Sequence, residues 1–147
     1  MIMIKTHIEL EMAHRLYGVE TYSEECRDNV HGHSYKVDIV VQRREGEGEL
    51  DGNGMVIDFK KLKETVREFE KEWDHSCVLH EGDPLCEVML RECKKVHVVE
   101  ENPTAEWMCM KFKDELNEKL EELEEEVEVV EVDVGETSGN IAVWKKD

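Results

Sequence analysis

The chain has 147 residues, 39% of them hydrophobic, and its 37 acidic side chains against 19 basic ones give a formal net charge of −18. This length suits a single core, so residues 1–147 are predicted to form one domain. Such an acidic surface repels phosphate groups, which argues against nucleic-acid binding and against attachment to an anionic membrane. No apolar run approaches the roughly 18 residues of a membrane helix, and the first residues lack a signal-peptide layout. A soluble, cytoplasmic protein is therefore expected.

Alternating hydrophobicity predicts two strands near the start of the chain, over residues 2–14 and 33–43. Side chains two apart in a strand project to the same face. His14 therefore ends the apolar face of the first strand, while His31 and His33 open the apolar face of the second. The residues that fix these faces are Ile8, Leu10, Met12, Tyr35, Val37, Ile39 and Val41.

The three inward-facing imidazoles form a candidate metal site. Zinc held by the nitrogens of His14, His31 and His33 would keep a fourth position open for water or substrate, as catalytic zinc sites do. Cys26 lies in the polar segment between the two strands. It could be a fourth ligand that closes the site, or a reactive thiol whose pKa is lowered by the nearby cation. The spacing alone leaves both interpretations open.

The middle of the chain predicts two helices. Asp58 is a good N-cap for the first, whose apolar residues recur at intervals of three and four. Residues 76–95 show no clean period and are predicted to form an extended loop, followed by a brief strand over 96–99. Asn102 is predicted to cap the second helix, with Pro103 at its first position.

A C-terminal hairpin completes the predicted elements. Valines alternate with acidic residues from Val130, a turn follows near residues 138–140, and residues 141–145 return. The order ββααββ predicts an α+β fold with a four-stranded antiparallel sheet and two helices on one face. The parity of the valines also directs Glu136 inward, where a carboxylate is costly unless it is bonded. A turn residue without a ligand is the alternative interpretation of this glutamate.

Short sequence islands along nearly the whole chain carry a family resemblance. They are Ala13-His14-Arg15-Leu16, Cys26 with His31-Gly32-His33, Gly54-Met55-Val56-Ile57-Asp58-Phe59, Asp74-His75, Asn102-Pro103-Thr104-Ala105-Glu106 and Gly135-Glu136-Thr137. In this order they resemble the 6-pyruvoyl-tetrahydropterin synthase and 6-carboxy-tetrahydropterin synthase family. The resemblance implies a T-fold, whose subunits associate edge to edge into a closed β-barrel. It also implies a homo-oligomer, with a hexamer as one option, and zinc as the cofactor.

The resemblance further implies roles for individual residues. Cys26, Asp74 and His75 would form a proton-transfer set in which the carboxylate orients the imidazole. Glu136 would grip the ring of a small-molecule pterin substrate, and Thr104 would line the same pocket. From the residues alone, Asp74-His75 also fits a helix end at which a protonated histidine meets the helix dipole.

The resemblance implies a zinc-dependent lyase that acts on 7,8-dihydroneopterin triphosphate. One product would be 6-carboxy-tetrahydropterin, with acetaldehyde and triphosphate released, for 7-deazaguanine (queuosine or archaeosine) synthesis. The alternative is 6-pyruvoyl-tetrahydropterin, formed without C–C cleavage. Four residues separate Cys26 from His31, between the three of the carboxy-forming branch and the five of the pyruvoyl-forming branch.

The segment 102–106 resembles the carboxy-forming branch more closely, so that activity is the leading expectation. A non-catalytic protein that binds zinc or a pterin, with Cys26 as a fourth metal ligand, is the alternative from another functional class.

Overall fold

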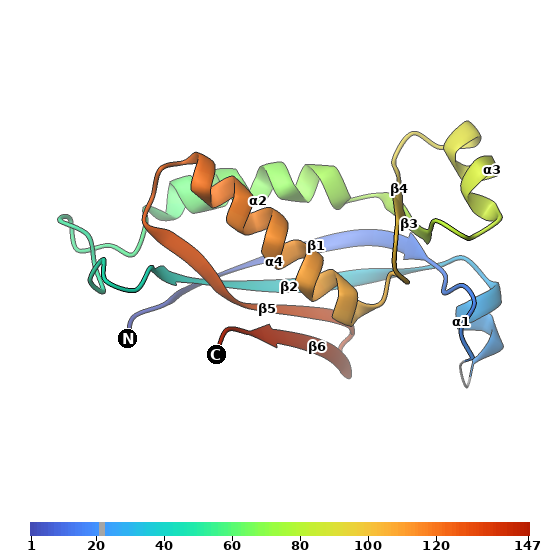
Figure 1. The fold of residues 1–147 in the computed structure, drawn as a ribbon, viewed down its shortest axis with the longest axis horizontal. Coiled ribbons are helices and arrows are strands. Elements are labelled where there is room, and N and C mark those ends of the chain that lie inside the picture. The colour runs from blue at the N-terminus through green and yellow to red at the C-terminus, as the bar shows by residue number, and fades with distance from the viewer. Residues whose placement is uncertain (21–22) are drawn as a thin grey trace.

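A computed structural model describes residues 1–20 and 23–147, and in this part of the chain two long helices cover one face of a six-stranded sheet (Figure 1). The strands are β1 (Ile4–His14), β2 (His31–Arg43), β3 (Ser76–His80), β4 (Val96–Val99), β5 (Val127–Thr137) and β6 (Asn140–Lys145). The helices are α1 (Glu24–Asp28), α2 (Phe59–Trp73), α3 (Leu85–Glu92) and α4 (Ala105–Glu122). The strand order is β4-β3-β1-β2-β5-β6.

The α+β class is as predicted, but the sheet is mixed, and the prediction of four antiparallel strands is wrong. β1, β2, β5 and β6 do pair antiparallel in that order. β3 instead runs parallel to β1, and β4 runs parallel to β3. Residues 76–79 are all buried, so β3 shows no alternation from which a strand could be predicted. Residues 76–95 are consequently not an extended loop, because they contain both β3 and α3.

The second long helix begins later than predicted. Thr104 is its N-cap, and the Thr104 hydroxyl accepts a hydrogen bond from the Trp107 N–H at 3.1 Å. Asn102, the predicted cap, instead uses its side-chain amide to bind the backbone of Tyr17. The first long helix begins as predicted, since the Asp58 carboxylate accepts a hydrogen bond from Lys60 N–H at 2.7 Å.

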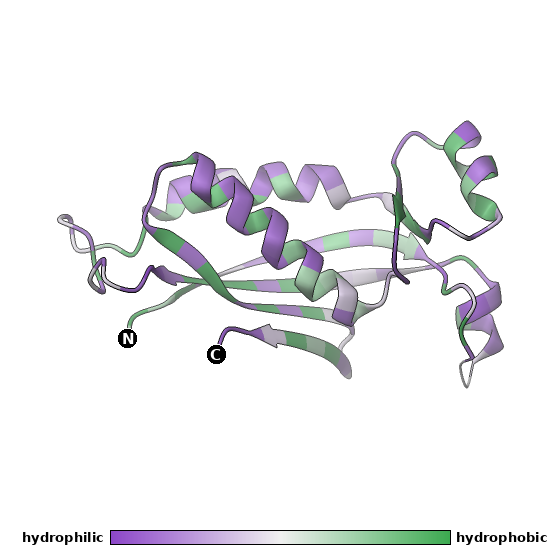
Figure 2. Ribbon diagram, in the orientation of Figure 1, coloured by the Kyte–Doolittle hydropathy of each residue, from purple (hydrophilic) through white to green (hydrophobic). Residues whose placement is uncertain are grey.

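The core lies between the inner face of the sheet and the helices α2 and α4. The Phe112 ring there meets the rings of Phe69 and Trp73 edge to face, with centroid distances of 4.9 and 5.1 Å. The outward surfaces of both helices are hydrophilic (Figure 2). On the uncovered face of the sheet, Glu9 and Lys36 are exposed.

The short helices α1 and α3 contain no buried residue, which explains why no apolar stripe predicted them. Both lie at the end of the sheet where β1 finishes and β2 begins (Figure 1). Across residues 1–20 and 23–147, no helix has the length and apolar character needed to cross a bilayer.

Candidate metal centre and active site

The register between β1 and β2 brings the three histidines together. His14 lies directly opposite His31, and Met12 lies directly opposite His33. Opposed residues in an antiparallel pair share a face, so all three imidazoles point to the helix-covered side of the sheet. The ring centroids of the three histidines are 4.7 to 5.4 Å apart.

Backbone carbonyls fix the orientation of two of these rings. His14 Nδ1 lies 2.7 Å from Pro103 O, and His31 Nδ1 lies 2.8 Å from Asn29 O. A carbonyl only accepts, so each Nδ1 carries a proton, and in the neutral form of either ring the free lone pair is on Nε2. Those two Nε2 atoms face one another at 3.1 Å. Two opposed lone pairs repel unless a cation lies between them, which fits a metal ion.

Glu136 adds a carboxylate to the same group. β5 pairs with β2 so that Val134 is opposite Val37, which puts Glu136 on the inner face as the alternation predicted. Glu136 Oε1 lies 2.8 Å from His33 Nε2 and 3.8 Å from His14 Nε2. His33 Nε2 is nevertheless buried without a well-aligned hydrogen bond.

One possible ligand atom from each of these four residues lies within 4.8 Å of all the others. Three imidazole nitrogens and one carboxylate oxygen are the donor types that zinc prefers. The cluster of His14, His31, His33 and Glu136 can therefore hold a metal ion, in agreement with the zinc site predicted on the three histidines.

Burial favours the neutral form of two imidazoles in this cluster, those of His14 and His33. His14 is only 3% exposed, and burial lowers its pKa, although the Pro103 carbonyl and Glu136 partly oppose that shift. Burial also lowers the pKa of His33. The phenol of Tyr35, 3.4 Å from His14 Nδ1, has its pKa raised by burial and stays protonated. Neutral imidazoles are the form that binds a metal.

Asp74 and His75 form a hydrogen-bonded pair outside this cluster, between α2 and β3. Asp74 Oδ2 lies 2.8 Å from His75 Nδ1, while Asp74 Oδ1 accepts a hydrogen bond from Glu11 N–H at 2.8 Å. Burial would raise the pKa of Asp74, but these hydrogen bonds outweigh it and leave the pKa below its ordinary value. The ionised carboxylate thus orients the imidazole, whose ring is 76% exposed. The pair borders an open hollow of about 510 Å³ that Arg67 and Lys95 also line.

The remaining two predicted site residues, Cys26 and Thr104, are not members of the cluster. Cys26 is half-buried in α1, and its Sγ is not among the clustered ligand atoms of the described residues. Thr104 immediately follows Pro103, whose carbonyl holds the His14 ring. The structure thus joins the three histidines with Glu136, places Thr104 beside their support, and leaves Cys26 and the Asp74–His75 pair outside the cluster.

Sequence reasoning missed the groups that orient the rings. Asn29 and Pro103 act through backbone carbonyls, which every residue type possesses, so no side-chain pattern could indicate them. Tyr35 was predicted only as an inward residue, and its hydroxyl lies at 3.4 Å from both nitrogens of His14.

The sequence profile described as 6-pyruvoyl tetrahydropterin synthase matches residues 3–147. The chain belongs to this family. Its fold is similar to a solved structure of 6-pyruvoyl tetrahydropterin synthase from Caenorhabditis elegans, with a TM-score of 0.70 at 23% identity over 99% of this chain and 96% of the other. An uncharacterized protein from Wolinella succinogenes gives a TM-score of 0.79 at 22% identity, over 99% and 98% of the two chains.

Relatives named 6-carboxy-5,6,7,8-tetrahydropterin synthase share more of the sequence. The protein of that name from Rickettsia felis is 31% identical over 123 residues, which are 82% of this chain and 83% of the relative. Its namesake from Aquifex aeolicus is 34% identical over 126 residues, 81% of this chain and 75% of the other. This member of the 6-pyruvoyl tetrahydropterin synthase family therefore combines a residue cluster that can hold a metal ion with relatives named for a carboxy product.

Proposed function

We propose that this family member is a 6-carboxy-tetrahydropterin synthase. It would convert 7,8-dihydroneopterin triphosphate to 6-carboxy-5,6,7,8-tetrahydropterin, with release of acetaldehyde and triphosphate, as a step toward 7-deazaguanines. The observation that carries the proposal is the cluster of His14, His31, His33 and Glu136, in which two Nε2 lone pairs face each other. The relatives named for the carboxy product favour that product over the pyruvoyl one.

Zinc is the metal we propose for this cluster, held by the three histidines. When bound, it would supply Lewis acidity toward oxygens of the substrate side chain. The carbonyls of Pro103 and Asn29 would keep His14 and His31 in the tautomer that offers Nε2. These outer contacts matter because they fix ring orientation and raise ligand basicity.

Glu136 is proposed to anchor the pterin. Its side chain is partly exposed although one oxygen faces the imidazoles. A carboxylate in this position can accept hydrogen bonds from two adjacent N–H donors, which the pyrimidine edge of a pterin presents. Thr104, beside the cluster, is proposed to line the same pocket.

Cys26, Asp74 and His75 are proposed to move protons on the substrate side chain. The Asp74 carboxylate orients the His75 ring through the 2.8 Å contact, as a proton-transfer partner requires. Cys26 lies outside the metal cluster, which supports its role as a thiol base rather than as a fourth ligand. We further propose that the protein acts as a homo-oligomer, with the hexamer as one option.

The test is product analysis with zinc-loaded protein and 7,8-dihydroneopterin triphosphate. We expect mass spectrometry to detect 6-carboxy-tetrahydropterin and acetaldehyde in equal amounts. His33→Ala should lose both zinc and turnover, whereas His7→Ala, which changes an exposed histidine paired with Asp38, should keep both. A pyruvoyl product without acetaldehyde would assign the protein to the other branch of the family.

The binding-protein alternative has its own test at Cys26. If the thiol is a base, Cys26→Ala should retain stoichiometric zinc and lose turnover. If the thiol is a fourth ligand in a non-catalytic protein, the same variant should release zinc, and the wild type should show no turnover.

A further inference from the structure

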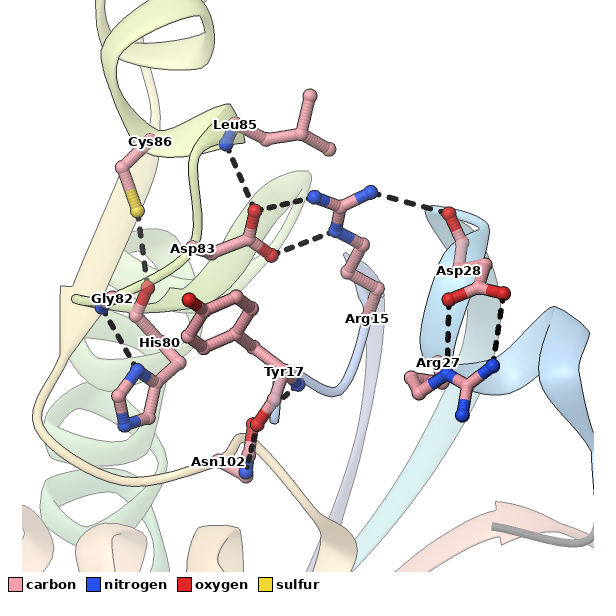
Figure 3. Close-up of polar contacts among 10 residues, drawn as sticks. All are labelled: Arg15, Tyr17, Arg27, Asp28, His80, Gly82, Asp83, Leu85, Cys86 and Asn102. Carbon is pink, nitrogen blue, oxygen red and sulfur yellow. Dashed lines mark hydrogen bonds and ion pairs between the residues drawn. The ribbon is translucent and has the colours of Figure 1, made fainter. Parts of the chain in front are cut away.

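A buried ion pair joins the end of β1 to the turn before α3 (Figure 3). Arg15 directly follows the candidate metal ligand His14, and its guanidinium grips Asp83 through two contacts, Nε to Oδ2 at 2.7 Å and Nη2 to Oδ1 at 2.5 Å. The Asp83 side chain is fully covered and the Arg15 side chain is 17% exposed. Asp83 also accepts a hydrogen bond from Leu85 N–H at 2.8 Å, which fixes the carboxylate in place.

The same guanidinium extends to the helix that carries Cys26. Arg15 Nη1 donates a hydrogen bond to Asp28 O at 3.1 Å, at the last residue of α1. The next residue, Leu16, donates its N–H to the carbonyl of Cys26 itself at 3.3 Å. Because α1 contains no buried residue, it lacks an apolar face that could fix its position. These two hydrogen bonds therefore tie α1 to the end of β1.

The segment that supplies these bonds is anchored a second time. The Asn102 side chain accepts a hydrogen bond from Tyr17 N–H at 2.8 Å and donates one to Tyr17 O at 2.9 Å. Asn102 precedes Pro103, whose carbonyl orients His14. Residues 15–17 are thus held between Asp83 on one side and the support of the metal cluster on the other.

Burial of an ion pair costs desolvation energy, and in some proteins buried ionic groups specify one geometry rather than add stability. A two-contact guanidinium–carboxylate pair is planar, so Asp83 fixes the direction in which Arg15 Nη1 points. With the plane fixed, Nη1 meets the terminal carbonyl of α1, where a cation also complements the helix dipole.

We propose that Arg15 and Asp83 are a positioning pair that sets the location of the Cys26 helix relative to the metal cluster. The pair touches no substrate in this role and acts through α1. The expected effect of this pair on turnover rests on the proposed role of Cys26. Its expected effect on the position of α1 does not depend on that role.

The test uses Asp83→Asn and Arg15→Met in the full chain, with Asp114→Asn and Arg91→Met as matched controls in exposed pairs on α4 and α3. Arg15→Lys retains the charge but not the planar fork.

Hydrogen exchange by mass spectrometry on residues 23–30 reports on α1, zinc content reports on the cluster, and kcat reports on Cys26. We expect exchange in α1 to become at least about threefold faster and kcat to fall about tenfold or more. Zinc content and KM should hold, and Arg15→Lys should fall between wild type and Arg15→Met.

The double variant Arg15→Met/Asp83→Asn should resemble the single variants, because the two residues act as one unit. Unchanged exchange in α1 would overturn the positioning role whatever the activity, and so would a loss of activity that merely follows a loss of zinc. Should the wild type fail to turn over the pterin, the exchange data would still decide the structural part, so failure of the proposed function can be told from failure of this proposal.

Discussion

At the scale of single residues, burial lowers the pKa of two imidazoles in the cluster, those of His14 and His33, and so favours their neutral form. His14 is covered by the core, its Nδ1 proton is committed to Pro103 O, and its neighbours are two further imidazoles. The lowered pKa of His14 follows chiefly from burial. The burial that leaves His14 neutral and able to bind a metal should therefore make the metal-free protein less stable in acid.

Protonation of His14 should therefore make stability depend on pH. Its folded-state pKa lies below the ordinary 6.5, so as the pH falls below that value the unfolded chain binds protons first. The free energy of unfolding should be fully retained above pH 6.5 and fall below it, by up to about 1.4 kcal/mol per pH unit. Urea unfolding of EDTA-treated protein at pH 7.5 and 5.5 measures this change. His14→Gln should reduce the fall and His7→Gln should not; equal falls in all three proteins would contradict the prediction.

The thiols offer a second prediction at this scale. Cys77 and Cys109 are buried, and burial raises the pKa of each to about 11, whereas Cys93 is exposed. Only the thiolate is nucleophilic. Iodoacetamide at pH 8 should therefore modify Cys93 in the native protein and leave Cys77 and Cys109 intact until urea is added. Peptide mass spectrometry after timed quenching gives the order of modification, and early labelling of Cys109 would be the contrary result.

At the scale of elements, sequence periodicity predicts those strands and helices that have one buried face. β1, β2 and α2 each alternate or repeat in that way, and their pairing parity correctly directed His14, His31 and His33 to one side. β3 has two buried faces, while α1 and α3 have none, so no period marks them. The groups that orient the His14 and His31 rings could not be predicted for a different reason, because they are the backbone carbonyls of Pro103 and Asn29.

The N-cap of α2 should contribute measurably to stability. Asp58→Ala removes the carboxylate that accepts the Lys60 N–H hydrogen bond, which should lower the free energy of unfolding by about 1 kcal/mol. Asp114→Ala, on the exposed side of α4, should change it by less than about 0.5 kcal/mol. Urea denaturation of both variants decides the matter, and indistinguishable midpoints would show that the cap is dispensable.

At the scale of the whole molecule, the sheet ends in strands with an unpaired edge. On β6, Ile141 and Val143 are 59% and 60% exposed, and an exposed apolar edge strand readily pairs with another chain. This edge supports the proposed homo-oligomer. It is also the surface at which assembly can be tested without touching the candidate site.

The variant Ile141→Lys/Val143→Lys should shift the protein from its oligomer toward the monomer, because two charges would be buried at each joined edge. Analytical ultracentrifugation over a concentration series measures the distribution. Met110→Lys, an exposed position on α4, is the control and should leave it unchanged. An oligomer that survives in the double variant would place the subunit contact elsewhere.

The ladder between β1 and β2 runs from Ile4–Val41 to His14–His31. Segments inside this ladder must keep their length, whereas the connection outside it can become longer or shorter. Loss of one residue inside either strand would exchange its two faces, removing candidate metal ligands and core residues together. The connection from residue 15 to residue 30 lies outside the ladder, and it includes the four residues between Cys26 and His31. Insertions and deletions there can alter the reach of the thiol without shifting the strand register that brings His14, His31 and His33 together. Under the proposed function, engineering of product choice should therefore begin with the length of that connection.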